Sequence, residues 1–212
     1  MKYLLAAGSL VLATAVYAQS TGPVASKPEA DQRATAGPQY TAAGELVRPA
    51  DFREWMFVTS GLGMTYNQPQ PVSGQAAVPR PPSFTNVYVN PSSYRAFMKT
   101  GEWPDKTMFI LEIRASASEG SINKGGHFQS NLVVIEASVK DEARFPGKWA
   151  YFDFGRDMKT QVAALPRTER CYACHAEHAA VDNTFVQFYP TLLEVATKMG
   201  TVKAAASAPT GH

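Results

Sequence analysis

The chain has 212 residues, 45% of them hydrophobic and 18% charged, and its formal net charge at pH 7 is +2. This length suits one domain, and the apolar fraction is sufficient to bury a core. The near-neutral charge excludes a protein that holds nucleic acid or an anionic membrane through a basic surplus.

The first eighteen residues have the pattern of a secretory signal peptide. Lys2 supplies a positive charge, residues 3–17 are mostly apolar, and Ala18 is a small residue at the expected cleavage site. The apolar run is shorter than the ~20 residues that span a bilayer. We therefore expect residues 1–18 to be cleaved on export to the periplasm, with a retained anchor as the alternative.

Two segments lack the apolar periodicity of folded structure. Residues 19–44 and residues 201–212 are rich in Ala, Ser, Thr, Gly and Pro. Such segments bury too little apolar surface to offset the entropy lost on ordering, so both are expected to be flexible. We therefore predict that residues 45–200 form a single folded domain.

A helix is the first element predicted in this domain. Asp51 is suited to cap a helix whose apolar positions run from Phe52 to Phe57, with Gly61 to end it. A proline-rich loop, residues 67–83, follows without regular structure.

A strand and a short helix are predicted next. Residues 84–90 form a β-branched and aromatic run of strand length. Asn90, Pro91 and Gly101 occupy the positions of a helix cap, a first helical residue and a helix terminator.

The second half of the chain reads as strands followed by helices. The predicted strands cover residues 107–116, 130–139 and 148–154, and the predicted helices cover a cysteine-containing segment and residues 191–200. Strands followed by helices indicate an α+β domain, in which an antiparallel sheet has helices packed at one side.

Both cysteines lie in the segment CYACH, residues 171–175. A disulfide between Cys171 and Cys174 would close a very short loop and add little stability. A structural zinc site normally takes its ligands in two separated pairs, and a thioredoxin-type dithiol needs a βαβ context. Neither feature is present in the sequence.

The same five residues form the attachment signature of haem c. Cys171 and Cys174, one helical turn apart, can each form a thioether with a vinyl group of the macrocycle, and His175 then lies under the iron. Haem attachment after export agrees with the leader. The sequence therefore predicts one covalently attached haem c, with His175 as the iron ligand.

Other candidate ligands are weaker. His178 lies on the same side of the predicted helix as His175, and His127 follows a Gly-Gly turn. The methionines in apolar runs are typical of core residues. Phe185 and Phe188 recur at helical spacing and are expected to pack against the haem or the core.

Four segments resemble the cytochrome P-460 family, which includes the cytochromes c′-beta. They are FREWMFV, NVYVNPSSYRAFMKTGEWPDKT, VIEASVKDEARFPGKWAYF and CYACHAEHAAVDNTFVQFYP, and they cover roughly residues 45–195. The resemblance implies a mostly β fold with a few helices, a homodimer, and a five-coordinate haem with His175 as proximal ligand.

Two activities occur in the family that the chain resembles. Some members carry a lysine cross-linked to the macrocycle and oxidise hydroxylamine, whereas c′-beta members lack it and bind nitric oxide. Leu111 occupies the cross-linking position here, with Lys106 the nearest lysine, in a turn. The resemblance therefore implies an NO-binding protein, and hydroxylamine oxidation becomes the alternative.

The strand pattern also predicts an apolar pocket. Alternation places Phe109, Leu111 and Ile113 on one face, where they would line the distal side of the haem or fill the sheet core. A distal side without hydrogen-bond donors favours NO over dioxygen.

Glu136 is the candidate catalytic residue. Alternation places its carboxylate with Leu132 and Val134 on an apolar face, where burial would raise its pKa and suit it to proton transfer. It matches the proton-relay glutamate of hydroxylamine-oxidising relatives, and an exposed edge-strand glutamate is the other reading. A plain electron carrier with a redox partner cytochrome is the third hypothesis.

Overall fold

The computed structural model describes residues 37–65 and 81–204. The strands are β1 (Leu46–Val47), β2 (Met56–Leu62), β3 (Phe84–Val89), β4 (Met108–Ala117), β5 (Phe128–Lys140), β6 (Trp149–Asp153) and β7 (Gln161–Val162). The helices are α2 (Pro91–Thr100), α3 (Arg170–His178) and α4 (Pro190–Met199), with short 3-10 helices η1 (Phe52–Glu54) and η2 (Val186–Phe188).

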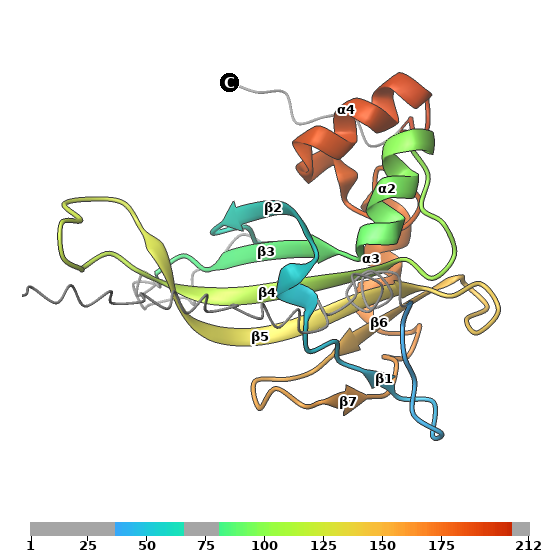
Figure 1. The fold of residues 1–212 in the computed structure, drawn as a ribbon, viewed down its shortest axis with the longest axis horizontal. Coiled ribbons are helices and arrows are strands. Elements are labelled where there is room, and N and C mark those ends of the chain that lie inside the picture. Colours follow the sequence, from blue (N-terminus) through green and yellow to red (C-terminus); the bar gives the residue numbers. More distant parts are fainter. Residues whose placement is uncertain (1–36, 66–80, 205–212) are drawn as a thin grey trace, which may run out of the picture.

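A five-stranded antiparallel sheet, ordered β2-β3-β4-β5-β6, forms the centre of the molecule (Figure 1). Strands β1 and β7 make a separate two-stranded sheet. The three helices gather at one end of the large sheet, opposite the tip of the long β4–β5 hairpin. The α+β class predicted from the order of strands and helices is confirmed.

The predicted helix after Asp51 is wrong. Only η1 forms, and the chain turns extended at Trp55, whose ψ is 176°. The following residues form β2, an edge strand that pairs antiparallel with β3. Its β-branched Val58 and Thr59 suit a pleated strand, and pairing with β3 overrides the helical spacing of the aromatic residues. Among the apolar residues that were predicted to share one face of that helix, Phe52 alone is fully buried.

The predicted second helix is confirmed as α2. Pro91 is its first residue, and Gly101 ends it with a φ of 72°, a conformation that favours glycine. Asn90 precedes the helix, but its side chain makes no cap hydrogen bond there. Its Oδ1 instead accepts a hydrogen bond from the backbone N–H of Met108 (2.9 Å), which ties the start of α2 to β4.

The large sheet separates two apolar clusters. The first cluster lies on the face covered by the helices and includes Phe97, Trp103, Phe109, Trp149, Tyr189 and Leu192. The second cluster lies on the opposite face and includes Leu46, Phe52, Met108, Ile110, Ile135 and Phe152. Alternation along β4, β5 and β6 therefore sends neighbouring residues to opposite faces, as a pleated sheet requires.

A bulge in the β4–β5 pair changes one predicted face. Val134 pairs with Ile113 and Leu132 with Arg114, with an irregularity between the two pairs. Leu132 consequently packs against the second cluster, on the face opposite Glu136. The predicted grouping of Leu132 with Glu136 is therefore wrong, because one extra residue reverses the side to which the strand projects.

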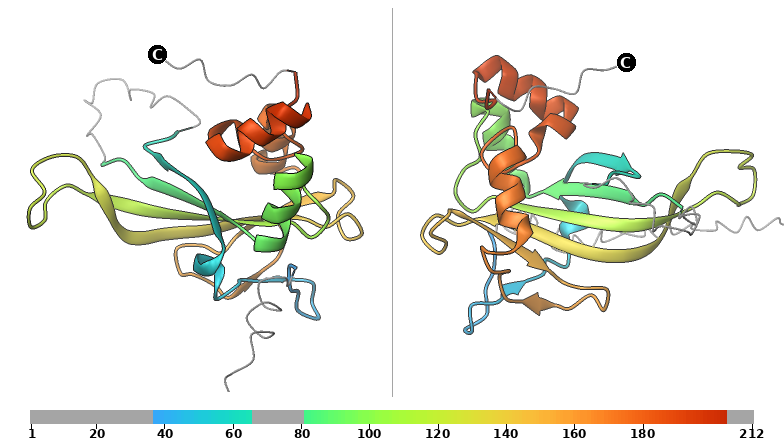
Figure 2. Two further views of the ribbon diagram at one scale, coloured as in Figure 1. Left: turned by 45° about the horizontal axis from the view of Figure 1, so that its top comes forward. Right: turned by 180° about the vertical axis from the view of Figure 1, so that it is seen from behind.

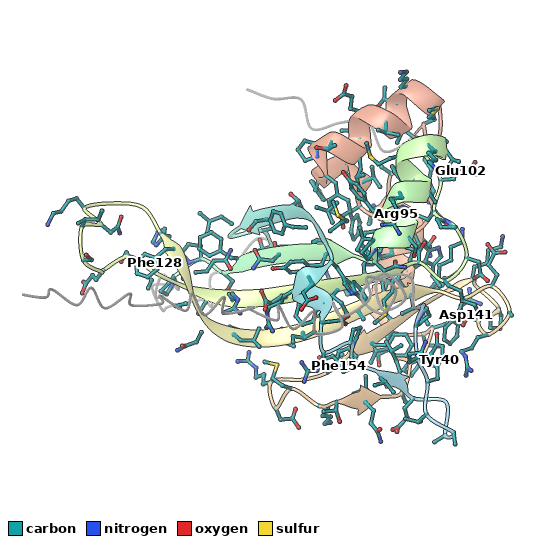
Figure 3. All side chains as sticks on the ribbon, viewed as in Figure 1. Tyr40, Arg95, Glu102, Phe128, Asp141 and Phe154 are labelled. Carbon is teal, nitrogen blue, oxygen red and sulfur yellow. The ribbon has the colours of Figure 1, made fainter. Side chains whose placement is uncertain are left out.

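The β4–β5 hairpin projects away from the helices, as the two further views make clear (Figure 2). Phe128, in the last strand pair before the tip of this arm, lies at the far side of the molecule from Asp141 and Tyr40 (Figure 3). Tyr40, in the segment 19–44 that was expected to be flexible, forms an isolated antiparallel β-bridge with Leu46.

The predicted signal peptide, most of the lead-in and the proline-rich loop, and most of the tail lie outside the described residues. In the described part of the chain, no helix combines the length and apolarity of a membrane span.

Candidate haem site

Helix α3 carries both cysteines and the motif histidine on one of its sides. The sulfurs of Cys171 and Cys174 form no disulfide. No residue of α3 is fully buried, although Tyr172, Cys174 and His175 are half-buried. The segment was predicted to be helical, and the structure confirms this.

Tyr172 fixes α3 to the loop between β5 and β6. Its hydroxyl donates a hydrogen bond to the carbonyl of Gly147 (3.3 Å), and the Arg167 guanidinium lies 4.2 Å from its ring centre. A Cβ at position 147 would approach the Tyr172 hydroxyl to 2.3 Å, so only glycine permits this contact. Tyr172, one of the two residues between the cysteines, thus anchors the helix to the β5–β6 loop.

The His175 ring lies between two aromatic rings. The ring centroid of Tyr151 is 4.5 Å away and that of Phe185 is 4.3 Å away. Burial lowers the pKa of His175 below its ordinary value of 6.5, although a hydrogen bond from the ring opposes this shift. At neutral pH the imidazole is therefore neutral, which is the form that binds a metal.

A backbone carbonyl fixes the tautomer of His175. Its Nδ1 lies 2.8 Å from the carbonyl oxygen of Asn183. Because a carbonyl only accepts hydrogen bonds, Nδ1 carries the proton and Nε2 keeps its lone pair. This is the usual arrangement of an iron-binding histidine, whose second nitrogen donates to a carbonyl.

Asn183 belongs to a tight turn, residues 181–184, which we call the 181–184 turn. Val181 and Thr184 exchange two backbone hydrogen bonds, of 3.3 and 2.9 Å. Asp182 has a φ of 52°, which aspartate tolerates better than most residues. The turn presents the Asn183 carbonyl to α3.

A hollow of about 460 Å³ opens beside α3. Its size lies within the range of ligand pockets. It is lined by Arg170, Ala173, Cys174, Glu177, His178, Phe185, Gln187 and Phe188. Cys174 and the Phe185 ring that packs on His175 thus face space that the described residues leave unfilled.

Glu136 and Leu111 lie side by side on the sheet face that carries the first cluster. They are directly paired residues of β5 and β4, and Asp153 of β6 pairs with Glu136 on its other side. Burial, and secondly the Asp153 carboxylate, raise the pKa of Glu136 above its ordinary value of 4.5. Glu136 and Asp153 also raise the pKa of the Cys171 thiol, behind a larger effect of burial, so these carboxylates lie near α3.

The predicted distal residues occupy different surroundings. Leu111 is half-buried and packs against the first cluster. Phe109 is 4% exposed and lies within that cluster, with its ring centroid 4.8 Å from that of Trp103 and 6.3 Å from that of Tyr189. Lys106 is held by an ion pair with Asp141 in the turn before β4.

The other candidate ligands differ in position. His178 lines the hollow beside α3, where it is exposed and lies 3.7 Å from Glu177, its neighbour in the chain. His127 is exposed at the tip of the β4–β5 hairpin. Met108 packs in the second cluster, on the other face of the sheet.

The residues present fit a haem. A neutral imidazole offers Nε2, two cysteines without a disulfide lie on the same helix, and the rings of Phe185 and Phe188 form part of the wall of the adjacent hollow. Asn183 adds a buried side-chain donor, Nδ2, that has no partner among the described residues. Within the described residues, 37–65 and 81–204, no three His, Cys, Asp or Glu side chains lie close enough together to hold a metal ion on their own. Iron in a porphyrin needs only one such side chain.

Fold and site together agree with one class of protein, a haem cytochrome. The profile of the Cytochrome P460 family matches residues 49–186, well over half of the chain. The chain therefore belongs to this family, which confirms the resemblance seen in its sequence. A comparison with curated proteins finds no match.

Two features of the site were missed by sequence reasoning. The Asn183 carbonyl was not recognised as the partner of His175, and Tyr151 was not recognised as one of the rings that contact its imidazole. Asp182 and Asn183 together signal a turn, so the turn itself was within reach. Its contact with α3 depends on tertiary structure.

Proposed function

We propose that this protein is an exported mono-haem cytochrome c of the P460 type that binds nitric oxide at a five-coordinate haem. Cys171 and Cys174 hold the group through two thioethers, and Nε2 of His175 is the single protein ligand of the iron. Such a haem supplies an iron centre with one vacant coordination position.

The observation that carries this proposal is the position of Leu111. It lies directly beside Glu136 on the sheet face toward α3, at the place where the resemblance puts a cross-linking lysine. Lys106 does not replace that lysine, because its ammonium group is paired with Asp141. An aliphatic side chain offers no hydrogen bond to a polarised ligand, and NO depends less on such a bond than dioxygen does.

The chain's own residues would act in three ways at such a centre. The Asn183 carbonyl holds the proton on Nδ1 of His175 and so keeps Nε2 free. The rings of Tyr151 and Phe185 restrict the orientation of the imidazole. Leu111 keeps one side of the site apolar.

Titration of the ferrous protein with NO tests the proposal. We expect stoichiometric uptake, with a change in the visible spectrum complete at one NO per haem. The variants Cys171→Ala and Cys174→Ala test covalent attachment, since each removes one thioether and the double variant should release haem on denaturation. A protein that takes up no NO in the ferrous state would overturn the proposed function.

Hydroxylamine oxidation is the second candidate, and Glu136 is the observation that favours it. Its carboxyl has a raised pKa and lies near the haem-binding helix, as a proton acceptor in such a reaction requires. Turnover of hydroxylamine with an artificial electron acceptor, lost in Glu136→Gln and kept in Asp153→Asn, would establish this activity. Absence of turnover in the parent protein would exclude it.

Location and assembly complete the proposal. The leader containing Lys2 supports export to the periplasm, where haem is attached to cysteine pairs. The resemblance supports a homodimer, and a redox partner cytochrome belongs to the electron-carrier hypothesis. Sedimentation of the mature protein and its recovery from the periplasmic fraction test the first two of these expectations.

A further inference from the structure

A buried lysine lies close to the turn that contacts the haem-binding histidine. Lys140, the last residue of β5, is only 8% exposed. Its ammonium group donates to a carboxylate oxygen of Asp182 (2.9 Å) and to the backbone carbonyl of Trp103 (2.8 Å). Because an unpaired lysine is rarely buried to this extent, these contacts account for its position.

Trp103 holds the other side of the same turn. Its indole Nε1 donates a hydrogen bond to the hydroxyl of Thr184 (2.7 Å), and its ring stacks on Phe97 with centroids 4.0 Å apart. Lys140 thus contacts Trp103 and Asp182, while Trp103 contacts Thr184. The 181–184 turn is thus held at Asp182 and Thr184, the two residues on either side of Asn183. The groups that hold them, Lys140 and Trp103, also contact each other.

Asn183 lies between these two held residues. Its carbonyl oxygen accepts the Nδ1 proton of His175, at 2.8 Å. A small rotation of the peptide bond between Asn183 and Thr184 would lengthen or misalign this hydrogen bond, and hydrogen bonds weaken steeply with angle. The position of Asp182 therefore affects the imidazole through a single intervening residue.

We propose that Lys140, through its ion pair with Asp182, is a positioning residue that sets the strength of the hydrogen bond from His175 to Asn183. This inference rests on the proposed role of His175 as iron ligand. A strong hydrogen bond from Nδ1 makes Nε2 a better electron donor, and such outer contacts tune metal sites. The pair thereby lowers the reduction potential of the haem.

Two substitutions separate positioning from simple charge effects. Lys140→Met removes a positive charge, whereas Asp182→Asn removes a negative one. If the pair acts only as point charges, the two variants shift the reduction potential in opposite directions. If it positions Asn183, both raise the potential, because both weaken the donor strength of His175.

The experiment measures reduction potential and the iron–histidine stretching frequency of the ferrous holoprotein. We expect both variants to favour the reduced form by about threefold to tenfold, tenfold being ~59 mV for one electron. We also expect both to lower the stretching frequency. Lys140→Arg, which keeps the ion pair, should stay close to the parent protein.

Lys148→Met is the matched control. The ammonium nitrogens of Lys140 and Lys148 each lie 3.5 Å from a carboxylate oxygen of Glu142, but of these two lysines only Lys140 contacts Asp182. The control should leave both readouts unchanged. If Lys140→Met does not accumulate, Asp182→Asn and Asp182→Glu carry the test, because the Asp182 side chain is 30% exposed.

Two results would overturn the inference: opposite shifts with an unchanged stretching frequency, or no shift in either variant. A six-coordinate parent protein that takes up no NO would defeat the proposed function instead. The reduction potentials of the variants would still decide the role of Lys140 in that case, so the two failures are distinguishable.

Discussion

Two glutamates on neighbouring strands of the sheet have opposite surroundings. Glu112 of β4 faces the second cluster and is 1% exposed. It accepts hydrogen bonds from Arg53 (2.5 and 2.8 Å) and Arg114 (2.9 and 3.0 Å). Glu136 of β5 lies on the other face, near α3, where its pKa is raised by burial and by another carboxylate, Asp153, and is affected by no cation.

The difference in partners gives opposite pKa shifts. Burial alone would raise the pKa of both glutamates. At Glu112 the hydrogen bonds from Arg114, Arg53 and Asn86 together outweigh burial and lower the pKa below its ordinary value. At Glu136 nothing opposes burial, and its pKa is raised. A buried carboxylate with arginine partners serves structure, whereas one without them is suited to exchange protons.

Removing the paired glutamate has the largest expected effect. Glu112→Ala should lower the free energy of unfolding by about 3 kcal/mol, because two arginines lose their shared carboxylate. Urea denaturation of the mature protein measures this. Glu136→Ala is the control and should change stability much less, since no cation depends on Glu136. Equal losses in the two variants would show that the two faces do not differ in this way.

Giving Glu136 a cation should make it resemble Glu112. Leu111 is its direct neighbour on β4, so Leu111→Arg places a guanidinium beside the carboxylate. The pKa of Glu136 should then fall, as expected for a carboxyl near an arginine. Carboxyl carbon chemical shifts followed against pH measure it, and Leu111→Met should leave the pKa unchanged. An unaltered pKa in Leu111→Arg would contradict the placement of these two side chains.

The pH dependence of stability should differ in sign between the two sites. Below about pH 4.5, the ordinary value of a glutamate, Glu136 is protonated in both the folded and the unfolded chain and has no effect. As pH rises above 4.5, the unfolded chain releases this proton first, so the folded state loses stability relative to Glu136→Gln. We expect a difference of about 1 kcal/mol or less, which levels off above the folded pKa.

Glu112 should behave in the opposite way. Its folded pKa is lowered, so its contribution to stability is complete above pH 4.5 and is lost as pH falls through the folded pKa. Glu112→Gln should therefore be less stable than the parent protein at neutral pH, with the gap closing in acid. Denaturation curves at several pH values measure both variants. If the stability differences between the parent protein and the two variants changed with pH in the same direction, the opposite pKa shifts of Glu112 and Glu136 would be contradicted.

Local signals in the sequence predicted much of the fold. Pro91 and Gly101 marked the ends of α2, and alternating apolar residues marked β4, β5 and β6. CYACH predicted a haem, which the family match bears out, while attachment of the haem at these residues stays a prediction. These features depend on residues close together in the chain, so a single sequence contains them.

Features that depend on distant contacts were not predicted. The chain after Phe52 forms an edge strand because β3 is available to pair with it, and β1 and β7 are too short to show periodicity. The bulge near Arg114 moved Leu132 to the other face. Lys140 and Asp182 are far apart in the chain, and nothing in either segment identifies the other as its partner.

The coordination state of the haem tests the central claim most directly. In the purified mature protein, the absorption and resonance Raman spectra should show a five-coordinate high-spin haem in the ferrous state, with one histidine ligand. His175 would then be the only protein group on the iron, and the second axial position would be open. A six-coordinate low-spin spectrum, or a preparation without haem, would contradict the account.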